Sequence, residues 1–196
     1  MKNANFLLVG VGGQGTLLVS NVMAHVGIRA GFDVKKAEVH GMAQRGGSVS
    51  SHIRWGEKIH SPLIGCGEVD YLLAFEKLEA LRYVEMLRPG ATVLVGEMRT
   101  PPLSVSSGDD VYPSDQELRT ILGQVTDKLH LVPSLSLAQK AGSIRAHNIV
   151  MMGALSRLIE QVPIETWLAV VGEWVPKKYV EVNQRAFRAG REAGFN

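Results

Sequence analysis

Apolar residues occur along this chain in short unbroken runs that alternate with stretches of helical periodicity. Residues 6–9 are all apolar and end at Gly10, the pattern of a strand buried on both faces of a parallel sheet. Over residues 15–29 apolar side chains recur at intervals of four, which predicts a helix with one apolar stripe. Gly31 ends this helix, and residues 33–39 supply a second strand. The chain is therefore expected to open with a strand, a helix and a strand.

The region after this opening predicts some antiparallel pairing. Residues 40–47 contain three glycines and few apolar side chains, which indicates a loop. Residues 48–55 alternate polar with larger side chains, as a strand with one solvated face does. The sequence Gly56-Glu57-Lys58 turns the chain toward Ile59, which is a hairpin signal. A β-hairpin is therefore expected within an otherwise parallel sheet.

The rest of the chain repeats the alternation of strands and helices. Apolar runs typical of strands recur at residues 71–75, 91–95 and 129–132. Residues 76–87 predict a helix that Pro89-Gly90 breaks, and residues 101–113 are rich in Ser, Pro, Gly and Asp, which predicts a surface excursion. The alternation predicts a single domain over residues 1–196, with three α/β/α layers and a mostly parallel, Rossmann-like sheet.

Composition and charge narrow the classes of function. The chain has 196 residues, 45% of them hydrophobic, which is enough for one substantial core. Lys and Arg number 21 against 19 Asp and Glu, a net charge of +2 without blocks of like charge, so neither nucleic acid nor a membrane is an expected partner. No stretch approaches the roughly 18 apolar residues that cross a bilayer, and the first apolar run is too brief for a signal peptide. A soluble cytoplasmic protein is expected.

A single cysteine limits the redox chemistry that this chain can hold. Cys66 alone excludes an internal disulfide. It also excludes a self-contained iron–sulfur cluster, which needs about four thiolates. The histidines show no spacing that favours a metal site, so no metal is expected on this chain.

Residues 10–15 read Gly-Val-Gly-Gly-Gln-Gly, follow a predicted strand and open a predicted helix. This is the context in which a G-x-G-x-x-G pattern points to dinucleotide binding, and Glu38 at the end of the second strand lies where a ribose-binding acid is wanted. The candidate binding residues are Gly10, Gly12, Gly13, Gln14 and Gly15. Three interpretations stay open: a dinucleotide, a phosphate or other ligand group, or glycines that only let the helix pack tightly.

Residues 38–49 form a second and more specific motif at the carboxyl end of a strand, where α/β proteins bind ligands. His40 and Gln44 offer hydrogen bonds, and Arg45 offers a planar fork for a carboxylate or phosphate. Gly46-Gly47 lets backbone approach a partner closely. These side chains are candidates for an active-site contribution, and the alternative is a polar turn with a solvated arginine.

Several segments together resemble the gamma subunit or domain of the pyruvate and ketoisovalerate oxidoreductase family, which comprises 2-oxoacid:ferredoxin oxidoreductases. The likeness lies in residues 10–15, in the loop 40–49, in Ser61-Pro62-Leu63-Ile64, in residues 75–81 and in Ala146-His147-Asn148-Ile149-Val150. It covers most of the chain. The amino-acid sequence of the loop 40–49 is similar to that of the indolepyruvate branch of the family.

The resemblance implies oxidative decarboxylation of an aryl pyruvate to an acyl-coenzyme A, with ferredoxin as electron acceptor. Such chemistry uses thiamine diphosphate and iron–sulfur clusters, with coenzyme A as the acyl acceptor. This chain lacks the thiamine diphosphate motif, since Gly108-Asp109-Asp110 is not followed by the rest of it. The resemblance therefore implies that the cofactors lie on a large alpha-type subunit, that this chain carries none and that it is inactive alone.

Two other functions compete with this one. The glycine loop favours a free-standing NAD(P)- or flavin-binding oxidoreductase of Rossmann type, and a ligand-sensing module without catalysis is the third possibility. Self-association of the isolated chain is a further expectation. Copurification of a thiamine- and cluster-bearing subunit discriminates among these.

Overall fold

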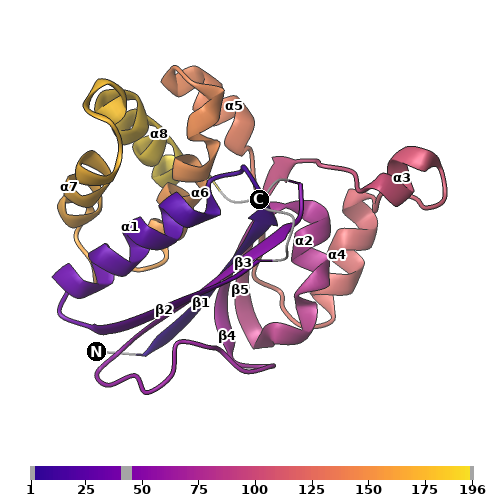
Figure 1. The fold of residues 1–196 in the computed structure, drawn as a ribbon, viewed down its shortest axis with the longest axis horizontal. Coiled ribbons are helices and arrows are strands. Elements are labelled where there is room, and N and C mark those ends of the chain that lie inside the picture. Colours follow the sequence, from indigo (N-terminus) through magenta and orange to yellow (C-terminus); the bar gives the residue numbers. More distant parts are fainter. Residues whose placement is uncertain (1–2, 41–45, 195–196) are drawn as a thin grey trace.

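The computed structural model describes residues 3–40 and 46–194, which form a six-stranded sheet in the order β2-β3-β1-β4-β5-β6 (Figure 1). The strands are β1 (Ala4–Val11), β2 (Asp33–His40), β3 (Ser48–Gly56), β4 (Val69–Glu76), β5 (Leu87–Met98) and β6 (Leu129–Val132). Strand β3 pairs antiparallel with both β2 and β1, whereas β1, β4, β5 and β6 pair in parallel. Five strands therefore point one way and β3 points the other.

Helices cover both faces of this sheet (Figure 1). They are α1 (Thr16–Arg29), α2 (Lys77–Arg82), α3 (Leu103–Ser107), α4 (Asp115–Gly123), α5 (Ser134–Ala141), α6 (His147–Arg157), α7 (Ile164–Trp174) and α8 (Val180–Glu192), with short 3-10 helices η1 (Val84–Met86), η2 (Ile144–Ala146) and η3 (Lys177–Tyr179). Helices α1 and α5 to α8 pack on one face, and α2 and α4 pack on the other. The predicted three-layer, mostly parallel architecture is confirmed.

Burial along β1 explains why its residues 6–9 are uniformly apolar. Phe6 and Leu8 pack against the layer of α1, whereas Leu7 and Val9 pack against the layer of α2 and α4. All four are no more than 1% exposed. Removing such side chains from water stabilises the fold by about 1.5–3 kcal/mol each, so the unbroken run is the signature of a strand with a helix layer on each side.

The predicted antiparallel pairing exists, but the prediction of a hairpin at residues 56–59 was wrong. Strand β3 pairs with β2, with His40 opposite Val49, and the connection between them spans residues 41–47. After Gly56 the chain does not continue as a strand. Instead the backbone amide of Ile59 donates to the Asp33 carboxylate at 2.8 Å, which ties this segment to the start of β2. The turn sequence therefore ends β3 and does not lead into a second, antiparallel strand.

The predicted helix over residues 76–87 was also too long. Helix α2 ends at Arg82, η1 follows, and β5 begins at Leu87, which is buried and pairs with Val69 of β4. Pro89-Gly90 therefore lies inside β5, where Gly90 has a φ of 75°. The regular apolar spacing of Leu78, Leu81, Val84 and Leu87 was misleading, because Leu87 packs from a strand.

The predicted surface excursion at residues 101–113 contains the short helix α3, which projects from the body of the molecule (Figure 1). Leu103 and Val111 are each 84% exposed there. In the part of the chain that the structure describes, no helix has the length and apolar character that crossing a membrane requires.

Candidate functional site at the carboxyl edge of the sheet

The two sequence motifs meet at one edge of the sheet, where β1, β4 and β5 end. The glycine loop, residues 10–15, connects β1 to α1. Residues 41–45 lie outside the described residues, so Gln44 and Arg45 are not placed, and only the backbone of His40 is described. The flanking residues are placed, however. The Gly12 amide donates to the Gly47 carbonyl at 2.9 Å, and the Gly46 amide donates to the Gly12 carbonyl at 3.4 Å. Arg45 is therefore one peptide away from a residue bonded to the glycine loop.

The side chain of Gln14 fills the glycine loop. It is 6% exposed, its Oε1 accepts from the Val11 amide at 2.9 Å, and its Nε2 donates to Thr100 Oγ1 at 3.2 Å. The Gln14 amide in turn donates to the Val11 carbonyl at 3.1 Å. Three amides of the loop, those of Val11, Gly12 and Gln14, are thus bonded within the protein and do not face a ligand.

Two of the glycines are required by close packing of protein groups. A Cβ on Gly10 would lie 2.7 Å from Gln14 Oε1, and one on Gly15 would lie 2.0 Å from Asn148 Nδ2, at the start of α6. Gly15 also has a φ of 85°, which favours glycine. Gly13 also has a φ of 108°, but it is exposed and a Cβ there would meet nothing within 4 Å. The packing interpretation therefore accounts for Gly10 and Gly15, and Gly13 is the part of the loop open to a ligand.

The position of Glu38 does not match that of a ribose-binding acid. In dinucleotide-binding sheets the second strand lies beside the first, whereas β3 separates β1 from β2 here. Neighbouring strands are about 4.8 Å apart, so β2 lies roughly 10 Å from β1. The Glu38 carboxylate is also engaged by Lys36 Nζ at 2.5 Å.

This geometry predicts that the chain does not bind a nicotinamide dinucleotide. Titration with NAD or NADP, followed by calorimetry, is expected to give no saturable signal at micromolar concentrations. Glu38→Gln, which removes the carboxylate charge, should leave the titration unchanged. Micromolar binding that Glu38→Gln abolishes would restore the dehydrogenase interpretation.

A buried carboxylate at the end of β4 was missed by the sequence reasoning. Glu76 is 1% exposed and accepts from the Glu79 amide at 3.0 Å, from the Thr100 amide at 3.1 Å and from the Tyr112 hydroxyl. Burial and the adjacent Glu76 raise the pKa of Tyr112, so its hydroxyl keeps its proton. Thr100 also accepts from Gln14. Glu76 therefore links the starts of α2 and of the excursion to the glycine loop.

Glu79 is a second buried acid, and it anchors the end of the motif at residues 38–49. It is 4% exposed, accepts from the Ser48 hydroxyl and pairs with Arg82 Nε at 3.1 Å. Burial raises the pKa of the Glu79 carboxyl. Ser48 is the first residue of β3, directly after the loop 41–47, so this contact fixes the loop's exit against α2. An acid at the end of a buried strand, and another three residues later, was the available sequence signal.

Residues at the start of α6 also lie at this edge of the sheet. Asn148 is 6% exposed and lies against Gly15, with its Nδ2 3.5 Å from the Gly15 carbonyl. The adjacent His147 is 7% exposed, and burial lowers the pKa of its imidazole, which favours the neutral form. Its ring contacts Phe75 of β4 edge-on, with 6.4 Å between ring centroids. Asn148 is thus a residue of the first turn of α6.

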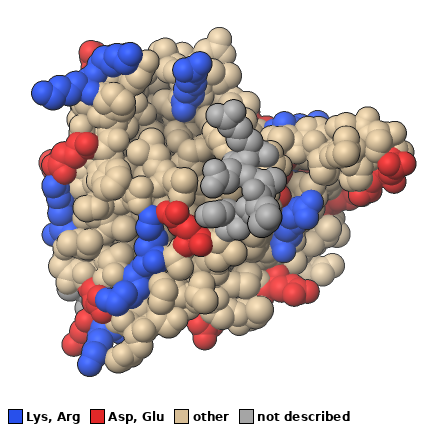
Figure 2. Space-filling model, viewed as in Figure 1, with Lys and Arg blue, Asp and Glu red and all other residues tan. Residues whose placement is uncertain are grey.

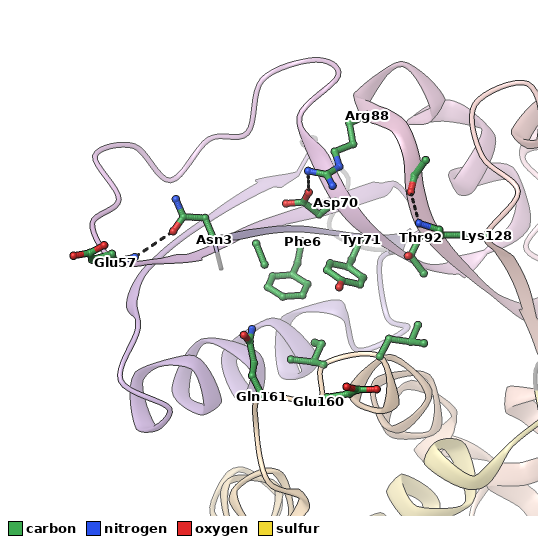
Figure 3. A pocket seen from close by; sticks show the side chains of 14 residues that line it. Asn3, Phe6, Glu57, Asp70, Tyr71, Arg88, Thr92, Lys128, Glu160 and Gln161 are labelled. Atoms are coloured by element: carbon green, nitrogen blue, oxygen red, sulfur yellow. Dashed lines mark hydrogen bonds and ion pairs between the residues drawn. The ribbon is translucent and has the colours of Figure 1, made fainter. Parts of the chain in front are cut away.

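A large hollow of about 1040 Å³ lies at the opposite edge of the sheet (Figure 3). Its lining mixes both signs of charge, and Arg88 pairs with Asp70 there at 2.5 Å. Among the predicted site residues that the structure describes, Gly10, Gly12, Gly13, Gln14 and Gly15, none lines it. The carboxyl edge, where both motifs meet, is therefore the candidate site.

A family model described as pyruvate ferredoxin/flavodoxin oxidoreductase matches residues 5–193. The chain belongs to this family. It is 38% identical to the indolepyruvate oxidoreductase subunit IorB of Thermococcus kodakarensis, covering 98% of this chain and 96% of that one. The IorB subunit of Archaeoglobus fulgidus is 39% identical, over 95% and 92% of the two chains. Membership of this family favours a subunit of a 2-oxoacid:ferredoxin oxidoreductase over a free-standing NAD(P)- or flavin-binding oxidoreductase.

Solved structures share the fold. The gamma subunit of a keto/oxoacid ferredoxin oxidoreductase from Geobacter sulfurreducens superposes with a TM-score of 0.71 at 23% identity, over 96% of each chain. The 2-oxoglutarate:ferredoxin oxidoreductase of Magnetococcus marinus gives a TM-score of 0.73 at 21% identity. That match covers 97% of this chain and 31% of the other, so the same fold is one part of a longer polypeptide there.

Proposed function

We propose that this chain is the small subunit of an indolepyruvate-type 2-oxoacid:ferredoxin oxidoreductase. The supporting observation is the difference in identity among its relatives. Four subunits of indolepyruvate oxidoreductases are 35–39% identical to it, whereas three subunits of 2-oxoglutarate synthases are 24–27% identical. The amino-acid sequence of residues 40–49 favours the same indolepyruvate branch.

The proposed complex converts a 2-oxoacid and coenzyme A to an acyl-coenzyme A, carbon dioxide, a proton and two electrons, and the electrons pass to ferredoxin. Thiamine diphosphate supplies carbanion stabilisation and iron–sulfur clusters carry the electrons. The residues of this chain do not fit a cluster, because Cys66 is its only cysteine. The chain also lacks the thiamine diphosphate motif. We therefore assign both cofactors to a large partner subunit, and we place the complex in the cytoplasm.

This chain's own part is to supply a rigid edge that completes the partner's site. The Gly12–Gly47 and Ser48–Glu79 contacts hold the end of the connection that leads into β3. The proposed contributors are His40, Gln44 and Arg45, together with the exposed Gly13 of the glycine loop. An arginine fork there orients an anion, such as a carboxylate or a phosphate of coenzyme A, and it excludes water from the reacting groups.

Reconstitution tests the proposal. The isolated chain is expected to contain no iron or thiamine and to show no 2-oxoacid oxidation. Adding the large subunit under anaerobic conditions, with a viologen dye as acceptor, should produce coenzyme A-dependent turnover. Stoichiometric iron or flavin in the isolated chain, or full activity of the large subunit alone, would contradict it.

Replacing Arg45 by Ala should lower activity of the reconstituted complex without destabilising the subunit. Loss of a guanidinium contact to an anion costs about 1.5–3 kcal/mol, roughly ten- to over a hundredfold in rate or affinity. The measurement is kcat/KM for both coenzyme A and the 2-oxoacid. Arg119→Ala, at an exposed position on α4, is the matched control and should change neither. Unchanged kinetics for Arg45→Ala would make Arg45 a solvated turn residue.

A further inference from the structure

A groove of about 390 Å³ opens beside the glycine loop. Its walls come from the first turn of α1, from the junction of η2 and α6, and from the link between α7 and α8. The apolar part of its lining comprises Leu18, Ala146, Val175, Pro176, Tyr179 and Val182. Asn148 also lines the groove and lies against Gly15. The groove is therefore continuous with the edge that carries the candidate site.

Large apolar side chains are exposed around this groove. Leu17 is 48% exposed and precedes the lining residue Leu18, Ile144 is 52% exposed and lies between two lining residues, and Tyr179 is 45% exposed and lines the groove itself. Exposed apolar side chains on the segments that form an apolar groove are typical of interaction sites. These three side chains therefore indicate a surface that another molecule covers.

Positive charge gathers at the same place. Segments 140–146 and 175–185 carry five basic residues, Lys140, Arg145, Lys177, Lys178 and Arg185, against the single acid Glu181. That acid is paired with Arg185 at 2.5 Å. The two segments together carry a net charge of +4, whereas the whole chain carries only +2. The surface is complementary to an acidic one.

We propose that the large subunit docks on this surface, defined by Leu17, Ile144, Arg145, Lys178 and Tyr179. An apolar side chain of the large subunit enters the groove, and acidic residues beside it face Arg145 and Lys178. Tyr and Arg are the residue types that most often anchor interfaces. The inference rests on the proposed function, and it adds the face of this chain on which the complex assembles.

Two other occupants fit this surface less well. A second copy of this chain, related by a twofold axis, would place Arg145 and Lys178 of both copies near one another, with like charges opposed. A ferredoxin that exchanges electrons transiently uses a small contact, whereas permanent subunit interfaces are larger and more apolar. The mainly apolar lining of this groove favours the permanent partner. Docking of the large subunit also covers the edge where Gly13 lies.

The test measures association of the full-length chain with the large subunit, without coenzyme A or ferredoxin, by calorimetry under anaerobic conditions. Ile144→Glu and Tyr179→Glu should each weaken binding at least about tenfold, because a charge is forced into the centre of an interface. Arg145→Glu should do the same and reduce the dependence of affinity on salt. Leu103→Glu, at an 84% exposed position on α3, is the control and should bind as wild type does.

The outcomes separate this inference from the proposed function. Because the altered positions are exposed, the variants should retain the melting temperature of the wild type, which is checked by circular dichroism. Wild-type association together with unchanged affinity of Ile144→Glu and Tyr179→Glu would overturn the docking surface alone. Unchanged association with a raised KM for ferredoxin or coenzyme A would also overturn it and assign the groove to that ligand. Complete lack of association of the wild-type chain would overturn both proposals.

Discussion

Gly190→Ala is expected to be among the most destabilising single substitutions in this chain. A Cβ at Gly190 of α8 would lie 2.0 Å from the Val150 carbonyl oxygen of α6, and one at Gly153 of α6 would lie 2.1 Å from the Phe187 carbonyl oxygen of α8. Real Cβ atoms essentially never approach a neighbour within 3.0 Å. The obstructing atoms are backbone, so one helix must move away from the other.

The expected cost is about 3 kcal/mol, which is typical of severe overpacking in a core. For a chain of this size that corresponds to a fall in melting temperature of about 6–12 °C. Gly123→Ala is the matched control, because Gly123 ends α4 and a Cβ there meets nothing within 4 Å. It should leave stability unchanged or raise it by up to about 1 kcal/mol. A melting temperature of Gly190→Ala within about 2 °C of wild type would show that α6 and α8 separate easily.

The crossing of α6 and α8 also matters for the candidate site. Helix α6 begins at His147, and Asn148 in its first turn packs on Gly15 at the glycine loop. Tyr179 and Val182, from the start of α8 and the turn before it, line the groove beside the same loop. A displacement of α6 against α8 would therefore alter the candidate site and the docking surface as well as stability.

The elements that the sequence predicted well are those with local signals. The apolar residues 6–9 and the glycines after them identified β1, the loop and α1, because burial on both faces and tight turns depend on neighbouring residues. The order of strands did not follow from such signals. Strand β3 lies between β1 and β2, and this position results from pairing across the sheet, such as Leu7 opposite His52, which the sequence does not display.

The candidate site shows the same division. The glycine loop and the loop after β2 were each identified from their residues, whereas their meeting is shown by the contacts of Gly12 with Gly46 and Gly47. The buried acids Glu76 and Glu79 were missed, because their importance comes from partners far along the chain. Glu76 accepts from Thr100 and Tyr112, and Glu79 accepts from Ser48. A sequence pattern shows that an acid lies at the end of a strand. Only the structure shows that this acid is buried and holds other segments of the site in place.

The substrate class gives the other large expected effect. The reconstituted complex should turn over indolepyruvate and phenylpyruvate with a kcat/KM about a hundredfold higher than that for pyruvate or 2-oxoglutarate, because burial of an aryl group in an apolar pocket contributes several kcal/mol. The reasons are the loop 40–49 and the higher identity to indolepyruvate oxidoreductase subunits than to 2-oxoglutarate synthase subunits.

The measurement is steady-state kinetics of the assembled pair under anaerobic conditions, with each 2-oxoacid at saturating coenzyme A and with ferredoxin or a viologen dye as acceptor. Because the thiamine-bearing subunit is expected to supply most contacts to the substrate, substitutions in this chain should change kcat/KM for all four 2-oxoacids by similar factors. Arg45→Ala provides that comparison. A preference for pyruvate or 2-oxoglutarate would reject the aryl pyruvate assignment, and membership of the family would stand because it rests on the match over residues 5–193.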